Sequence, residues 1–169
     1  LNIYLIMLLL LQATQAADSV QVAADELMKE AIANGKHILV EKSITLNSDE
    51  LDEAIALAKE KGVIIGEAMT IYHMPIYKEL KKILDSGRLG RVNLITMNFG
   101  SFKEYNMKNR FFNRNLAGGA MLDIGVYALS FIRWFFDSKP DQLLSQVKPA
   151  PTGVDAVSYT HLTLPTIRL

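Results

Sequence analysis

The chain has 169 residues, of which half are apolar, with 18 basic and 18 acidic side chains and no cysteine. This composition is that of a globular protein of one domain or parts of two. Zero net charge without a basic stripe argues against nucleic acid as a partner, and the lack of cysteine excludes disulfides and thiolate metal sites. The three histidines are scattered, so no metal site is expected.

The first eleven residues are almost wholly apolar, and the residues up to Ala17 are small and polar, which loosely imitates a signal peptide. A signal peptide needs a positively charged start, but the first basic residue is Lys29. The apolar run is also too short to span a membrane, so we expect a cytoplasmic protein with no membrane partner. A buried parallel strand is a fair alternative, because such strands are continuous apolar runs.

From Asp25 the sequence alternates regularly between helix and strand patterns. Leu27, Ala31 and Ile32 are expected to face inward from the first helix. The predicted elements are a helix over 25–33, a strand over 38–40, a second helix and a strand over 63–65. The second helix is expected to begin at the cap Asn47, with Glu50 at the capping-box position, and to end at Gly62. Helices and strands that alternate across short connections indicate parallel strands with right-handed crossovers, an α/β arrangement.

The second half, after a boundary near residues 69–75, is predicted to be α+β. Residues 92–99 alternate with a period of two, which predicts a long antiparallel strand. Residues 103–117 are polar and aromatic and indicate a loop. The predicted helices are one from Pro75 to Gly87, with Ile76, Leu80, Ile83 and Leu84 inward, and one over about 120–136.

The last residues have a different origin in our interpretation. Residues 157–166 match the in-frame translation of a transposase sequencing adapter. We therefore interpret residues 156–169 as adapter-derived and exclude them from the prediction of the fold. On this interpretation the natural protein continues past Asp155, and the chain is a fragment.

Glu41 and Lys42 directly follow the strand over 38–40. Ligands of parallel α/β sheets bind beyond the carboxyl ends of the strands, so a lysine there is placed to hold a ribose or substrate hydroxyl. Its charge would also favour the deprotonated form of a neighbouring acid. Position alone favours a simpler alternative, a solvated lysine at a strand end.

Gly118 and Gly119 open a helix that carries Asp123 and Tyr127 at i and i+4, on one face. Glycines let backbone approach a ligand closely, and a helix start favours negative charge. Beside Lys42, an acid and a phenol would suit alcohol–carbonyl redox chemistry, provided that a cation lowers the tyrosine pKa from its usual value of about 10. A capping aspartate and a half-buried core tyrosine are an equally weighted alternative.

Two other side chains are weaker candidates. Arg110 could clamp a substrate or a cofactor, or it could be an ordinary surface arginine. Glu67 follows a buried strand, which places it either near a cofactor or in a structural hydrogen bond.

Four stretches, residues 31–42, 66–69, 84–90 and 118–127, together resemble one family. Over about residues 25–155 the chain is similar to the glucose–fructose oxidoreductase, inositol dehydrogenase and rhizopine-catabolism (Gfo/Idh/MocA) family of NAD(P)-dependent oxidoreductases. Its tyrosine at 127 looks closer to the dihydrodiol dehydrogenase and glucose–fructose oxidoreductase branches, because inositol dehydrogenase types carry histidine there.

The resemblance implies a Rossmann domain followed by an α+β domain with a large, mostly antiparallel sheet. On that basis residues 24–70 are the C-terminal part of the Rossmann domain, and residues 71–155 begin the substrate and oligomerisation domain. It further implies NAD or NADP as cofactor, a sugar, polyol or related secondary alcohol as substrate, and a homo-oligomer when the protein is complete.

The resemblance also implies roles for six residues. Lys42 matches the lysine that touches the nicotinamide ribose and the substrate, Asp123 the acid that orients the substrate, and Tyr127 the residue that transfers the hydroxyl proton. The side chains predicted to face the cofactor are Glu41, Lys42, Glu67 and Arg110.

Three departures from the family limit this expectation. Ser43 stands where the family usually has proline, so a cis peptide after Lys42 is not expected. No Gly-x-Gly-x-x-Gly occurs in the sequence, so we expect the fragment itself to be inactive. Residues 1–23 match no family segment and are interpreted as out of frame or chimeric, with a divergent strand as the alternative. A non-catalytic sugar-binding or regulatory relative is the alternative function, and Ser43 is the feature in its favour.

Overall fold

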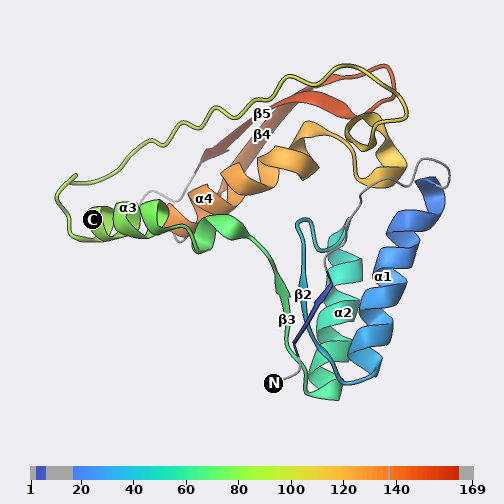
Figure 1. Cartoon of the computed structure of the whole chain (residues 1–169). Helices are drawn as coiled ribbons and strands as arrows, with labels where there is room; N and C mark the ends of the chain where they lie inside the picture. The colour runs from blue at the N-terminus through green and yellow to red at the C-terminus, as the bar shows by residue number, and fades with distance from the viewer. Residues whose placement is uncertain (1–2, 7–16, 137, 164–169) are drawn as a thin grey trace.

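The structure is a computed structural model that describes residues 3–6, 17–136 and 138–163. Its first half consists of strands β1 (Ile3–Ile6), β2 (His37–Val40) and β3 (Ile65–Glu67) with helices α1 (Ala17–Ala33) and α2 (Ser48–Lys61). The strand order is β1-β2-β3, and both pairs are parallel. Figure 1 shows α1 and α2 side by side against this sheet. The predicted parallel α/β arrangement is confirmed.

The apolar run at the N-terminus contributes β1, which pairs with β2 from Ile3 opposite His37 to Ile6 opposite Val40. The strand alternative is therefore confirmed for residues 3–6. Residues 1–2 and 7–16 lie outside the described part of the chain, and the interpretation of residues 1–23 as out of frame stays a prediction.

Helix α2 begins and ends where its sequence signals indicate. The Asn47 side chain accepts a hydrogen bond from the Glu50 N–H at 3.0 Å, and the Glu50 carboxylate accepts one from the Leu46 N–H at 3.0 Å. Gly62 adopts φ 65° after the last turn, a left-handed conformation that glycine reaches without steric cost. These two ends fix the connections on either side of α2.

The first core lies between α1, α2 and the sheet. Its buried side chains are Met28, Ile32, Ile38, Val40, Ala54 and Ala58. The prediction that Leu27 faces inward is wrong, since Leu27 is 53% exposed and its neighbour Met28 is 2% exposed. Met28 and Ile32 are four residues apart, so they share one face of α1, and Leu27 is turned away from it.

The second half contains helices α3 (Pro75–Asp85) and α4 (Val126–Phe136) and an antiparallel hairpin of β4 (Gln142–Pro149) and β5 (Asp155–Thr163). Four shorter turns are η1 (Thr70–Tyr72), η2 (Arg110–Phe112), η3 (Arg114–Leu116) and the π-helical η4 (Met121–Gly125). In Figure 1 the hairpin runs alongside α4. The predicted α+β character of this half is confirmed.

Two sequence predictions for this half are wrong. Residues 91–106 have no sheet partner among the described residues, so the strand predicted over 92–99 does not form. An alternating segment becomes a strand only through hydrogen bonds to a neighbouring strand. The face of α3 predicted to be buried is open at three of its four positions, since Ile76 is 64% exposed, Leu80 36% and Ile83 37%. Only Leu84 of that face packs against buried residues, as predicted.

Helix α4 packs on η1 and α3 in a second core of Met69, Ile71, Phe131 and Phe135. The segment Arg114–Phe136, with a mean hydropathy of 1.4, is by length and composition sufficient to cross a membrane. Its regular α-helical part, α4, has only 11 residues, whereas a membrane helix needs about 20. One such segment is weak evidence for a membrane span.

Strand β5 includes much of the segment that we interpret as adapter-derived, and it pairs with β4 through to Thr163. Residues 164–169 lie outside the described part. The adapter interpretation of residues 156–169 stays a prediction.

Candidate active site

Lys42 lies just beyond the carboxyl end of β2, and its side chain reaches the start of the α4 region. Its ammonium group donates to the Asp123 carboxylate at 2.9 Å and, in a short contact, to the Asp123 backbone carbonyl. The side chains of Lys42 and Asp123 are only 14% and 18% exposed. Lys42 is therefore not a solvated lysine at a strand end.

Asp123 lies in η4, a single π-helical turn directly before α4. Such turns place one extra residue in a helix and are frequent at functional sites. The Asp123 carboxylate does not cap its own helix; it accepts from Lys42 and from the Arg110 guanidinium, at 3.1 Å. The N–H of Asp123 bonds instead to the Gly119 carbonyl at 3.2 Å.

Tyr127 lies one turn after Asp123, in α4. The Lys42 ammonium group is 5.1 Å from the centre of its ring, and the Phe99 ring stacks near it with centroids 6.4 Å apart. Lys42, Asp123 and Tyr127 are thus brought together from two halves of the chain. The Lys42 cation therefore contacts the acid and lies over the ring of the tyrosine.

The four residues predicted to face a cofactor differ in their surroundings. Lys42 and Arg110 both contact Asp123. Glu67, at the end of β3, accepts a hydrogen bond from the Ile44 N–H at 2.9 Å, which ties β3 to the segment after Lys42. Glu41 is exposed and accepts from the Lys42 N–H at 3.3 Å. Both glutamates lie at the carboxyl edge of the sheet.

The prediction that the peptide after Lys42 is not cis is wrong. The Lys42–Ser43 peptide is cis, with serine in the position where proline was expected to be necessary. The Ser43 hydroxyl donates to the Leu122 carbonyl at 3.3 Å, and Lys42 on the other side of the bond contacts Asp123. Both residues of this peptide thus contact η4. The prediction rested on the presence or absence of proline alone, and it therefore did not anticipate the cis peptide.

Gly118 and Gly119 allow a close approach to other parts of this chain. A Cβ on Gly118 would stand 2.5 Å from the Arg110 carbonyl oxygen. One on Gly119 would stand 2.0 Å from the Asp155 carboxylate. The glycine pair therefore packs the loop that carries Arg110 against the start of η4.

Sequence reasoning missed Asp155. Its carboxylate accepts the Met121 N–H at 2.7 Å and so satisfies one of the unpaired donors at the start of the η4–α4 segment. Asp155 is 34 residues further along the chain, so no capping motif in the local sequence could have revealed it. Phe99 was missed for a similar reason, since its partner Tyr127 is not nearby in sequence.

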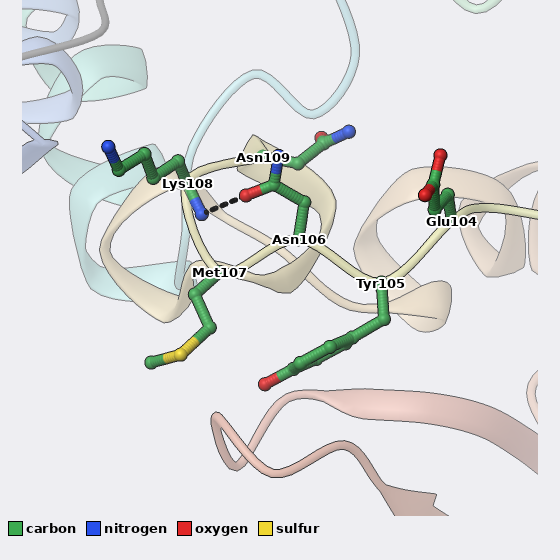
Figure 2. Close-up of a pocket in the computed structure, with 6 residues that line it drawn as sticks. All are labelled: Glu104, Tyr105, Asn106, Met107, Lys108 and Asn109. Atoms are coloured by element: carbon green, nitrogen blue, oxygen red, sulfur yellow. Dashed lines mark hydrogen bonds between the residues drawn. The ribbon is translucent and has the colours of Figure 1, made fainter.

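Among the described residues, hollows also occur outside this cluster. One of about 810 Å³ is bounded by residues 94–100, the η4–α4 segment and β5. Another, of about 530 Å³, is lined by Glu104 to Asn109. Figure 2 shows the Asn106 side chain in it turned back to the Lys108 N–H, at 2.9 Å, which stabilises the turn. Neither hollow includes Lys42, Asp123 or Tyr127 in its lining.

Comparison with known protein families identifies the family of this chain. Residues 77–167 match the Gfo/Idh/MocA C-terminal domain, and residues 16–69 match the oxidoreductase family with an NAD-binding Rossmann fold. The chain belongs to the Gfo/Idh/MocA oxidoreductase family. The expected fold, a Rossmann region followed by the start of the C-terminal domain, is confirmed, and the Rossmann family implies a nicotinamide cofactor.

Among curated proteins the chain is similar to trans-1,2-dihydrobenzene-1,2-diol dehydrogenases. It is 34% identical to the Xenopus laevis protein over 125 residues, which are 73% of this chain and 37% of that protein. It is 33% identical to the Bos taurus protein over 122 residues, 72% of this chain and 36% of that protein. The chain thus spans little more than a third of the length of these relatives.

Solved structures show the same fold. Aldose-aldose oxidoreductase from Caulobacter crescentus, complexed with glycerol, superposes with a TM-score of 0.73 at 21% identity, over 86% of this chain and 45% of that one. An NAD-binding protein from Listeria innocua superposes with a TM-score of 0.67 at 21% identity, over 84% of this chain and 41% of that one.

Proposed function

We propose that the complete protein carrying this chain is an NAD(P)-dependent oxidoreductase that interconverts a secondary alcohol and a carbonyl. The substrate class is a sugar, a polyol or a related diol such as a trans-dihydrodiol, the compound in the names of the curated relatives. The observation that carries the proposal is the contact of Lys42 with Asp123 and with the ring of Tyr127.

The residues present fit the nicotinamide end of such a cofactor. An ammonium group has three N–H donors, and two of those on Lys42 are directed at Asp123. Among the described residues the third has no acceptor, so it can serve a ribose or substrate hydroxyl beyond the carboxyl end of β2. A bound nicotinamide supplies or takes up the hydride.

The three side chains would share the remaining work. Asp123 accepts a hydrogen bond from a substrate hydroxyl and orients the alcohol. Tyr127 takes the proton of the reacting hydroxyl during oxidation and returns it during reduction. Lys42 holds Asp123 in place, and its positive charge near the Tyr127 ring favours the negative charge that develops on the phenol oxygen.

The test is turnover by the complete protein, followed at 340 nm, with NAD or NADP and a panel of aldoses, inositols and trans-dihydrodiols. Tyr127→Phe, Asp123→Asn and Lys42→Met are each expected to lower kcat by about 10²-fold or more. The matched control is Tyr72→Phe, because the Tyr72 hydroxyl contacts the Ser130 carbonyl at 3.4 Å and not the Lys42–Asp123 pair.

A complete protein that binds a sugar and the cofactor but turns over no member of the panel would favour the alternative, a non-catalytic relative. Equal losses of kcat in Tyr127→Phe and Tyr72→Phe would contradict the proposed role of Tyr127 in proton transfer.

A further inference from the structure

The Asp123 carboxylate is held asymmetrically. Its Oδ1 oxygen accepts from both the Lys42 ammonium group, at 2.9 Å, and the Arg110 guanidinium, at 3.1 Å. Among the described residues, no donor bonds to Oδ2. One oxygen thus carries both ion pairs, and the other remains available to a ligand.

The Arg110 guanidinium has a second contact, with the ring of Phe111. Its guanidinium carbon lies 4.4 Å from the centre of the Phe111 ring, a cation–π distance. The ammonium group of Lys103 contacts the same ring at 4.3 Å. A planar guanidinium that rests on a ring and donates to a carboxylate has little freedom to turn toward another partner.

The backbone that carries Arg110 is fixed as well. The Asn109 side chain accepts a hydrogen bond from the Phe111 N–H at 3.1 Å and so starts η2. Gly118 packs directly on the Arg110 carbonyl, where any larger residue would collide. The loop over 103–117 therefore presents the guanidinium to Asp123 from a rigid base.

We propose that Arg110 is a positioning residue, which holds Asp123 through Oδ1 so that Oδ2 faces the hydroxyl of the alcohol substrate. This inference rests on the proposed function. It replaces the expectation that Arg110 clamps the cofactor, and the two roles differ in what they predict. A positioning residue acts on the alcohol through Asp123, whereas a clamp acts on cofactor affinity.

The experiment is a double-mutant cycle in the complete protein with Arg110→Met, Asp123→Asn and the double variant. Arg110→Met is expected to lower kcat/KM for the alcohol by about 10–10²-fold, the cost of a misplaced orienting group. The cofactor Kd, measured by NADH fluorescence, is expected to stay within about twofold. In the Asp123→Asn background the same change is expected to cost much less, because Arg110 acts through that carboxylate.

Two further variants separate position from charge and from folding. Arg110→Lys keeps the charge without the planar fork and is expected to recover part of the loss. Arg114→Met removes an exposed arginine from the same loop and is expected to change neither kcat/KM nor Kd.

Additive effects of the Arg110 and Asp123 changes would overturn the inference, and so would a weakened cofactor Kd with an unchanged alcohol KM. If Arg110→Met does not fold, the Arg110→Lys cycle with Asp123→Asn decides by the same criterion. A wild-type protein with no turnover would overturn the proposed function, and this inference with it; an active wild type with an additive cycle overturns only the inference.

Discussion

Gly119 illustrates how tightly single residues are constrained around Asp123. It is buried, adopts φ +115°, and lies against the Asp155 carboxylate that caps η4. The sequence indicates only that glycines let backbone approach something closely. The structure identifies what approaches: at Gly119 it is the carboxylate of this chain, and at Gly118 the backbone of the Arg110 loop.

Gly119→Ala is therefore expected to destabilise the protein by about 3 kcal/mol or more, from overpacking and an unfavourable positive φ together. Urea unfolding measures the loss. Gly62→Ala is the control, because Gly62 also has a positive φ, of 65°, but open space at its Cβ, and should cost only about 1 kcal/mol. If Gly119→Ala costs as much in an Asp155→Ala background as in the wild type, the clash with Asp155 is not the cause.

At the scale of elements, η4 and α4 depend on a cap that comes from the hairpin. Because Asp155 satisfies the Met121 N–H, the turn that carries Asp123 is held by β5 as well as by the Lys42 ion pair. A helix start with an unsatisfied donor loses roughly 0.5–2 kcal/mol.

We expect Asp155→Ala to lower the free energy of unfolding by about 1–2 kcal/mol, and Asp155→Asn, which keeps an acceptor, by less. Thermal unfolding of both variants measures this order. Asp141→Ala, at an exposed position next to β4, serves as the control and should stay within about 0.5 kcal/mol of wild type. Equal losses in Asp155→Asn and Asp155→Ala would exclude the capping role.

The packing of α1 on α2 predicts a pH dependence. Burial, and then the charge of Glu50, raise the pKa of Asp25 above its ordinary value of 3.8. The folded state therefore binds this proton more tightly than the unfolded state, and the ionised carboxylate destabilises the fold at every pH above its raised pKa. Asp25→Asn should stabilise the protein at pH 7 by up to about 0.5 kcal/mol, after screening by solvent. The gain should vanish as the pH falls below 3.8.

Glu53→Gln, on the same pair of helices, is expected to change the stability at pH 7 in the opposite direction, that is, to lower it. The hydrogen bond from Lys29 lowers the pKa of Glu53 below its ordinary value of 4.5. Its contribution to stability is present above pH 4.5 and is lost as the pH falls through the lowered pKa. Unfolding curves of both variants between pH 3 and 7 check the two signs, and a destabilised Asp25→Asn at pH 7 would contradict the account of Asp25.

For the whole molecule, the sequence predicts what depends on local chemistry. The ends of α2, the start of α3 at Pro75 and the parallel first half follow from caps, proline and periodicity. The missing strand over 92–99 and the exposed face of α3 were mispredicted because both depend on partners distant in sequence. The meeting of Lys42 with Asp123 spans 81 residues, so spacing alone could not predict it, and the resemblance to a family was necessary.

The surface of the second half adds a prediction for the chain expressed by itself. Large apolar side chains are open to solvent there: Leu94 is 74% exposed, Phe102 92% and Leu144 67%. The extended segment over 91–106 also leaves backbone groups without sheet partners among the described residues, and such edges promote aggregation. We expect the 169-residue chain to be poorly soluble and to self-associate, as size-exclusion chromatography with light scattering would detect.

The same chain is expected to show no saturable binding of NADH. In the proposed function Lys42 and its neighbours serve the nicotinamide end, whereas the pyrophosphate of a dinucleotide is normally held by the backbone N–H groups of a Gly-x-Gly-x-x-Gly loop. That fingerprint does not occur in the sequence. A fluorescence titration of the refolded chain, with the complete protein as the control, measures this difference. Micromolar, saturable binding by the 169-residue chain would mean that the carboxyl edge of β1–β3 holds the dinucleotide by other groups, and the Lys42 site would have to be assigned anew.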